Sequence, residues 1–277
     1  MRIDGGGHVV WDQTVDSAMH VDGAVAAPNG GVVIQGTVPH RRGHGVDPAL
    51  LRVDPNGKLL WRRQLGGYVN AQAGATVAVD GGWLLPLKPM SPTNAIVAVK
   101  IANDGTVAHS GIYALDGVST STAIAVPAAT SGAFLIGSLF GPIAVVRVDG
   151  AGAQQWSKSY PVPGEPLSLV AQATADDGLF PGGVGRSSVL LGSFETQDSV
   201  LGLRIATGGE AYWVQTYGKF GSVSPVSVWA ETTADGGFVF GCSTDPPFYT
   251  VPFVSSGYVV KTDGYGVTGL YVPLPAP

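Results

Sequence analysis

The side chains best suited to chemistry gather in one stretch near the N-terminus, "PHRRGHGVDP" at residues 39–48. His40, His44 and Asp47 combine two imidazoles with a carboxylate, a set that can bind zinc or another divalent cation. Glycine and proline disfavour a helix here, so the spacing of the two histidines does not place them on one helical face. Solvated loop histidines are the simpler interpretation, and we expect no metal site.

Two cations in the same stretch favour a different ligand. Arg41 and Arg42 would repel a metal ion but attract the acidic group of a partner protein or a sugar carboxylate. His20 and Asp22, in "DSAMHVDG" at 16–23, add a third imidazole and a second carboxylate nearby in the chain. These residues indicate a binding site rather than a catalytic one.

No motif identifies catalytic residues. Nothing distinguishes a pair of carboxylates that would act as acid and base. The glycine-rich "GGVG" at 182–185 has no lysine and no following helix, so it lacks the features of a phosphate-binding loop. We therefore predict no catalytic residues and no cofactor.

Composition predicts an all-β fold. Of 277 residues 45% are hydrophobic and only 13% charged, and 41 glycines and 20 prolines interrupt the apolar runs, which is typical of short strands and many turns. The net charge of −5 argues against nucleic acid as a partner. No apolar run approaches the about 18 residues of a membrane-spanning helix, and the N-terminus lacks the apolar core of a secretory signal. Cys242, the single cysteine, is expected to be a buried, unreactive thiol.

The elements that must position these residues come from a repeat. One pattern, an apolar strand, a tight turn and a second strand, recurs about every fifty residues, as in "LLRVDPNGKLLW" at 50–61. The turn glycines of its six versions are Gly7, Gly57, Gly105, Gly152, Gly209 and Gly266. A second turn, such as "VDGG" at 79–82, lies between successive versions and occurs five times.

Four short strands therefore make one unit, which we letter a to d from the axis outward. Four-stranded antiparallel sheets repeated around a centre are the blades of a β-propeller. We expect one domain over 1–277, most simply five blades closed by an N-terminal outer strand. The predicted parts are a closing strand at 1–15, blade 1 at 16–65, blade 2 at 66–113, blade 3 at 114–160, blade 4 at 161–217, and blade 5 with a tail at 218–277.

Ring closure has alternatives. We expect residues 8–15 to pair as strand d with residues 257–263, because Trp11 matches the tryptophans of other units whereas the last unit has Leu270 there. The segment "VTGLYVPL" at 267–274 could instead supply that strand. A six-bladed ring completed by a missing segment or a partner chain is the main structural alternative.

The blade pattern, read as "DGG…G…VVKxD..G…W", resembles the propeller repeats of bacterial secreted and cell-surface proteins. The stretch "VDPNGKLLW" is also similar to the tryptophan-docking motif of quinoprotein-type repeats, although its turn is one residue shorter. The resemblance covers essentially the whole chain and implies architecture, because such propellers include assembly factors, adhesive modules and enzymes. It implies no quinone site. It favours an extracellular or cell-surface location.

Residues that recur from unit to unit are predicted to be structural. A basic side chain precedes each c–d turn and is expected to pack on the sheet and pair with an aspartate or an aromatic face. These residues are Arg2, Arg52, Lys100, Arg147, Arg204 and Lys261. Trp11, Trp61, Trp156 and Trp213 are expected to pack between blades. Asp4, Asp54, Asp149 and Asp263 begin the turns and are expected to hold them.

The irregular loops are the better indication of function. Because the a–b and c–d turns share one face of a propeller, the b–c and d–a loops share the other, which we call the loop face. Its long loops are at 37–48, 185–199 and 243–257, in blades 1, 4 and 5, and should converge on a binding site. The predicted site residues are His20, His40, Arg41, Arg42, His44, Asp47, Phe194, Phe248, Tyr249 and Phe253.

The inner strands suggest an alternative. Thr76, Gln172, Trp229 and Glu231 align near the axis and are expected to line a central channel. The leading hypothesis is a non-catalytic binding or scaffolding propeller that engages a protein or glycan, alone or within a larger complex. The alternative is an enzyme acting on a carbohydrate or other small molecule at the channel mouth, with Glu231 as acid or base and His20 or His44 assisting.

Overall fold

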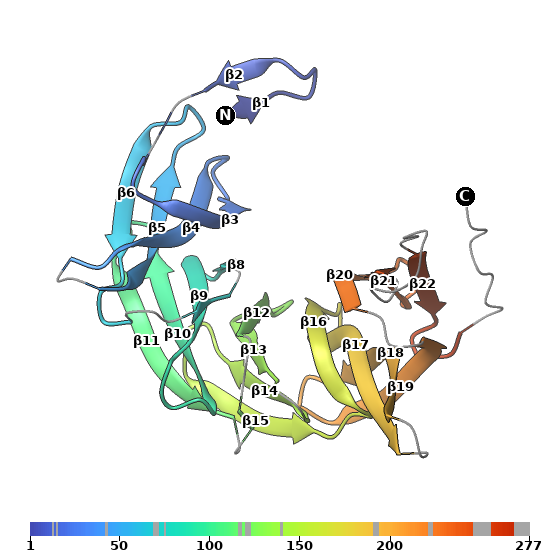
Figure 1. The fold of residues 1–277 in the computed structure, drawn as a ribbon. Helices are drawn as coiled ribbons and strands as arrows, with labels where there is room; N and C mark the ends of the chain where they lie inside the picture. The colour runs from blue at the N-terminus through green and yellow to red at the C-terminus, as the bar shows by residue number, and fades with distance from the viewer. Residues whose placement is uncertain are drawn as a thin grey trace.

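The computed structural model describes residues 1–12, 14, 16–41, 44–68, 72–74, 76–115, 118–119, 123–138, 141–190, 194–220, 224–245 and 256–268. Within these ranges the regular structure consists of 22 β-strands, and no helix is found. Consequently no helix that could cross a membrane occurs in the described part. The strands form six antiparallel sheets arranged along an arc (Figure 1). The all-β prediction is confirmed.

Blades 1 and 2 form the N-terminal part of the arc, after a small hairpin. The hairpin pairs β1 (Arg2–Ile3) with β2 (Val9–Trp11). Blade 1 contains β3 (His20–Ala26), β4 (Val32–Pro39), β5 (Val46–Val53) and β6 (Leu59–Gln64). Blade 2 contains β7 (Gln72–Ala73), β8 (Val77–Val79), β9 (Gly82–Lys88), β10 (Ala95–Ala102) and β11 (Val107–Ala114), with β7 and β8 sharing the inner place beside β9.

Blades 3 to 5 continue the arc. Blade 3 contains β12 (Ile124–Pro127), β13 (Ala133–Gly137), β14 (Ile143–Val148) and β15 (Gln154–Tyr160). Blade 4 contains β16 (Glu165–Ala173), β17 (Leu179–Leu190), β18 (Phe194–Ile205) and β19 (Ala211–Phe220). Blade 5 contains β20 (Ser224–Thr232), β21 (Phe238–Asp245) and β22 (Ser256–Thr262). In Figure 1 β3, β8, β12, β16 and β20 follow the concave side of the arc.

Strand composition follows position in the blade. The third strands of blades 2 and 3 are almost continuously apolar, as in "IAVVRV" of β14, and all six of its residues are buried, because neighbouring blades cover both faces. The outer strand β11 is largely exposed and mixes polar with apolar residues. Burial thus distinguishes strand c from strand d.

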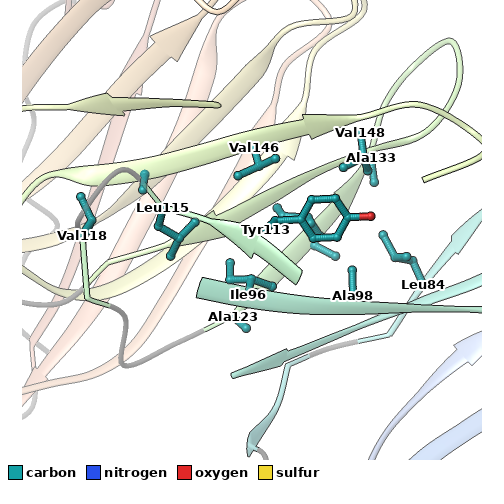
Figure 2. Packing of buried hydrophobic residues seen from close by; sticks show 13 residues of the cluster. Leu84, Ile96, Ala98, Tyr113, Leu115, Val118, Ala123, Ala133, Val146 and Val148 are labelled. Carbon is teal, nitrogen blue, oxygen red and sulfur yellow. The ribbon is translucent and has the colours of Figure 1, made fainter. Parts of the chain in front are cut away.

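Most of the hydrophobic core lies between blades, and one smaller cluster around Leu51 and Val53 belongs to blade 1 alone. One cluster joins Ile96 and Ala98 of blade 2 to Ala133 and Val146 of blade 3. Figure 2 shows the ring of Tyr113 lying between these two sets of side chains. Three further clusters join blades 1 and 2, 3 and 4, and 4 and 5. Each blade is therefore stabilised by its neighbours, as in other repeat folds.

The c–d turns are held by their first aspartate, as predicted. In blade 1 Asp54 Oδ1 accepts the backbone N–H of Asn56 at 2.8 Å and of Lys58 at 2.9 Å. The same pair of bonds recurs at Asp4, Asp149 and Asp263. Gly105 in the corresponding turn has a φ of 83°, and an added Cβ would lie 2.7 Å from the Trp61 ring of blade 1, so only glycine fits.

The recurring tryptophans join successive units, as predicted. Each indole Nε1–H donates to the carbonyl two residues before the turn glycine of the next unit. The four bonds are Trp11 to Pro55 at 2.8 Å, Trp61 to Asn103 at 2.9 Å, Trp156 to Thr207 at 3.0 Å and Trp213 to Gly264 at 3.1 Å. In blade 2 His109 takes the place of tryptophan, and Tyr113, bonded to it, donates its hydroxyl to Gly152 O at 2.6 Å.

The repeated basic residues are also structural, as predicted. The guanidinium of Arg52 lies 5.0 Å from the centre of the Trp83 ring and donates to Asn103 O at 2.9 Å in blade 2. Arg147, only 4% exposed, pairs with Asp177 of blade 4 at 3.1 Å. The repeated basic residues therefore stabilise the blades and the junctions between them.

The predicted closing strand is not formed in this structure. Trp11 and Val9 pair with β1, while the described contacts of β22 are with β21 and, through Thr262, with Thr268 after the c–d turn. The reason is that β1 takes the place beside β2 that β22 was predicted to fill. Trp11 and Arg2 both donate to Pro55 O, so this hairpin contacts blade 1 as strands c and d of a preceding blade would. Thr268 forms an isolated bridge with Thr262, and in the described part of the chain the arc is open between its two ends (Figure 1).

Candidate functional site

A pocket of about 640 Å³ opens on the loop face of blade 1. It is built where β4 ends, β5 begins and β6 ends, because these three strand ends meet at the same edge of the sheet. Its lining includes three of the predicted site residues, His40, Arg41 and Asp47. The structure therefore brings together the histidine, arginine and carboxylate of the first long loop.

A hydrogen-bonded network fixes the pocket wall. His40 Nδ1 lies 2.9 Å from Asp47 Oδ1 and 3.0 Å from Oδ2. Gln64 Nε2 donates to Asp47 Oδ2 at 2.7 Å. The Asp47 side chain is only 1% exposed, and a carboxylate so buried requires such donors. Because the carboxylate accepts from Nδ1, this nitrogen carries the imidazole proton and Nε2 remains for a ligand.

Three guanidinium groups give the pocket its charge. Arg41 donates Nε–H to Gln64 Oε1 at 3.2 Å, which ties the loop to the end of β6. Arg62 pairs with Asp16 at 2.8 Å, and Arg63 donates to Gly105 O at 2.7 Å. Asp16 compensates Arg62, so Arg41 and Arg63 against Asp47 leave one excess positive charge in a chain whose net charge is −5. The pocket is thus suited to an anionic group, which arginine binds in paired hydrogen bonds.

The other histidines of the prediction lie apart from this network. His20 is exposed, with Nδ1 3.1 Å from Asp22 Oδ1. His44 is exposed in the loop beyond Arg41. No group of three or more histidine, cysteine, aspartate or glutamate side chains arranged for a metal ion is found among the residues that the structure describes.

The inner-strand residues face different surroundings. Thr76 is buried, and its backbone N–H donates to Gln35 of blade 1. Gln172 Nε2 donates to Ala230 O of blade 5 at 3.3 Å, so it joins two blades. Trp229 is 43% exposed and Glu231 is exposed. Because the arc is open, these strands line a concave surface in the described part of the chain rather than a closed channel.

Several predicted residues cannot be placed. Arg42, Phe248, Tyr249 and Phe253 lie outside the described residues, and Phe194 begins β18 without a described side chain. The convergence of the three long loops therefore stays a prediction.

Sequence reasoning missed part of the pocket. Arg62, Arg63 and Gln64 were not predicted, although "WRRQ" at 61–64 differs from "WSKS" at 156–159 and "WVQT" at 213–216 in having two adjacent arginines. Strand d ends on the loop face, so the departure from the repeat at the end of β6 was the available signal.

The comparisons with known proteins agree with this architecture. No protein-family model matches the sequence, and no match was found among curated proteins. A eukaryotic initiation factor structure aligns over 92% of this chain and 55% of its own, with 11% identity and a TM-score of 0.51. The β-propeller domain of the trilobed protease from Pyrococcus furiosus, described as having an open velcro topology, aligns over 92% of this chain and 72% of its own, with 10% identity and a TM-score of 0.51. At such identities the likeness shows the fold alone, which is that of a β-propeller.

Proposed function

We propose that this propeller is a non-catalytic binding or scaffolding protein that engages an acidic group of a protein or glycan through the loop face of blade 1. The observation that carries the proposal is the pocket in which buried Asp47 orients His40 and Gln64 beside three arginines. The long loops of blades 4 and 5 would extend the same contact surface. An exported or cell-surface location, and assembly within a larger complex, belong to this proposal because the blade repeats resemble those of surface proteins.

The direct test uses the full chain and two acidic probes, an oligogalacturonate and a polyglutamate peptide, in a calorimetric titration at low and at physiological salt. Arg41→Ala should weaken binding about tenfold, because a charge-assisted hydrogen bond is lost. Binding should also weaken as salt screens the arginines. Lys58→Ala is the matched control, since Lys58 is an exposed cation of the same blade at its c–d turn.

The outcomes separate this proposal from an enzyme. Binding of either probe that Arg41→Ala weakens and Lys58→Ala does not supports the loop-face site. Equal binding by both variants, or no binding of either probe, overturns it. Hydrolysis of a carbohydrate or other small substrate that is lost in Glu231→Gln would support the enzyme alternative on the concave side.

A further inference from the structure

A second pocket lies on the opposite face of the propeller, between blades 4 and 5. Its volume is about 580 Å³, and it is bounded by the a–b turns of both blades and the c–d turn of blade 5. Asp176, Arg204, Tyr212 and Trp213 line it from blade 4, and Phe238 and Tyr265 line it from blade 5. This is the face of the uniform turns, where the sequence predicted no site.

The pocket exists because a link between turns is missing at this junction. Between blades 2 and 3, Asp80 accepts hydrogen bonds from Ser131 Oγ and Gly132 N, both at 2.8 Å. Between blades 3 and 4, Asp177 accepts from Thr130 N at 3.0 Å. At the next junction Gly236 stands at the turn position of Asp177, and the carboxylates beside this position are described as bonding within their own blades. Asp176 pairs with Arg204, and Asp235 with Lys261.

Two tyrosines at the pocket depart from the repeat. Tyr212 is 63% exposed and stands where the other blades have Leu60, Ala108 and Gln155. Tyr265 is 82% exposed and stands where the other turns have residues such as Asn56, Ala151 and Gly208. Neither position requires an aromatic side chain for blade packing. Two exposed rings at one pocket are therefore better explained by a ligand than by the fold.

The charges of the pocket are balanced. Arg204 is only 6% exposed and pairs with the half-exposed Asp176 carboxylate through Nη2 at 2.5 and 2.6 Å. The same guanidinium lies 5.4 Å from the centre of the Tyr212 ring, which holds this ring in place. Asp176 also accepts the Thr174 hydroxyl at 2.6 Å. One cation and one anion leave no net charge to attract an ion, while the carboxylate keeps acceptor capacity for hydroxyl groups.

We propose that the cleft between blades 4 and 5 binds a neutral oligosaccharide, with a sugar ring stacked on Tyr265 or Tyr212 and its hydroxyls bonded to Asp176 and Thr232. A sugar presents an apolar ring face and a polar rim, which matches exposed aromatic rings beside a few polar groups. The volume of the cleft holds a small ligand of this kind. This site does not depend on the loop-face site, whose charge selects an anion.

The test is a calorimetric titration of the full chain with neutral trisaccharides, namely cellotriose, mannotriose and chitotriose, at millimolar concentration. Tyr265→Ala should weaken binding of the bound sugar about tenfold, as expected when an aromatic stacking partner is removed. Tyr212→Ala should also weaken it. Saturation-transfer NMR should place the contacts on one face of the sugar ring.

Matched controls remove the equivalent residues of blade 1. Asn56 and Leu60 occupy the repeat positions of Tyr265 and Tyr212. The variants Asn56→Ala and Leu60→Ala should both bind the sugar as the wild type does. Arg41→Ala should also leave sugar binding unchanged, so a failure of the loop-face site and a failure of this site are distinguishable. The proposal is overturned if none of the three sugars binds the wild type, or if a bound sugar is unaffected by both tyrosine variants.

Discussion

Two junctions, between blades 3 and 4 and between blades 4 and 5, share a tryptophan contact and differ in an aspartate contact. In both, a tryptophan of the earlier blade donates to a turn carbonyl of the later one. Only at the first does a turn aspartate of the later blade, Asp177, also bond to the earlier blade. The first junction is closed over its turns, and the second is open as a pocket. The tryptophan contact common to these two junctions maintains the fold, and the pocket lies at the junction where no such aspartate link is found among the described contacts.

The largest effect should come from the shared feature. Trp156→Ala and Trp213→Ala should each lower the free energy of unfolding by about 3 kcal/mol, because each removes a large aromatic packed beside a core phenylalanine together with an interblade hydrogen bond. Urea denaturation would measure both. Ile112→Ala, at a 69% exposed position, is the control and should change little. If Trp213→Ala were as stable as the wild type, the junction between blades 4 and 5 would not depend on the tryptophan contact.

Removing the Asp177 contact, which only the junction between blades 3 and 4 has, should lower the free energy of unfolding by less. Asp177→Asn should cost about 2 kcal/mol at neutral pH, since the buried Arg147 loses its ionised partner. Asparagine suits the position, because Asp177 has a φ of 59°, a left-handed conformation that both residues tolerate. Asp235→Asn at the open junction should be close to wild type, because Asp235 and Lys261 are both exposed. Equal losses of stability in Asp177→Asn and Asp235→Asn would show that the two junctions do not differ in their dependence on a turn aspartate.

Much of this comparison was predictable from sequence, but the difference itself was not. The repeat predicted the strands, the turn aspartates such as Asp54 and the tryptophan contacts, because these depend on local spacing. The sequence has Asp177 in "ADDG" at 175–178 where "ADGG" at 234–237 has Gly236. It did not predict that Asp177 bonds across the junction, since this depends on how two blades meet. The predicted pairing of residues 8–15 with 257–263 is not found in the described part for a similar reason: Trp11 bonds to the next unit as the repeat implies, but the repeat does not say which strand pairs with β2, and this strand is β1.

The closed junction should also respond to pH. Burial of the Asp177 carboxyl opposes ionisation, but hydrogen bonds from Thr130 and the charge of Arg147 outweigh it, so its pKa lies below the ordinary value of 3.8. A group whose pKa is lowered by folding stabilises the native state above its unfolded pKa, and this contribution is lost as pH falls through the folded pKa. The stability difference between wild type and Asp177→Asn should therefore be constant from neutral pH to about pH 5 and shrink below pH 3.8. Melting temperatures of the two proteins across this range would test it, and a difference that persists at the acid end would rule out the charge as its cause.

The smallest effect on stability should come from the tyrosines of the open junction. Tyr265→Ala gives the turn of blade 5 the residue that blade 3 has at Ala151, and the bond from the backbone N–H of residue 265 to Asp263 does not need the ring. Because Tyr265 is 82% exposed, the free energy of unfolding should change by less than about 0.5 kcal/mol. The same variant should lose most of its affinity for a neutral sugar, so stability and binding separate at this position. A large loss of stability would mean that Tyr265 serves the junction between blades 4 and 5 rather than a ligand, and the open junction would then be a variant of the closed one.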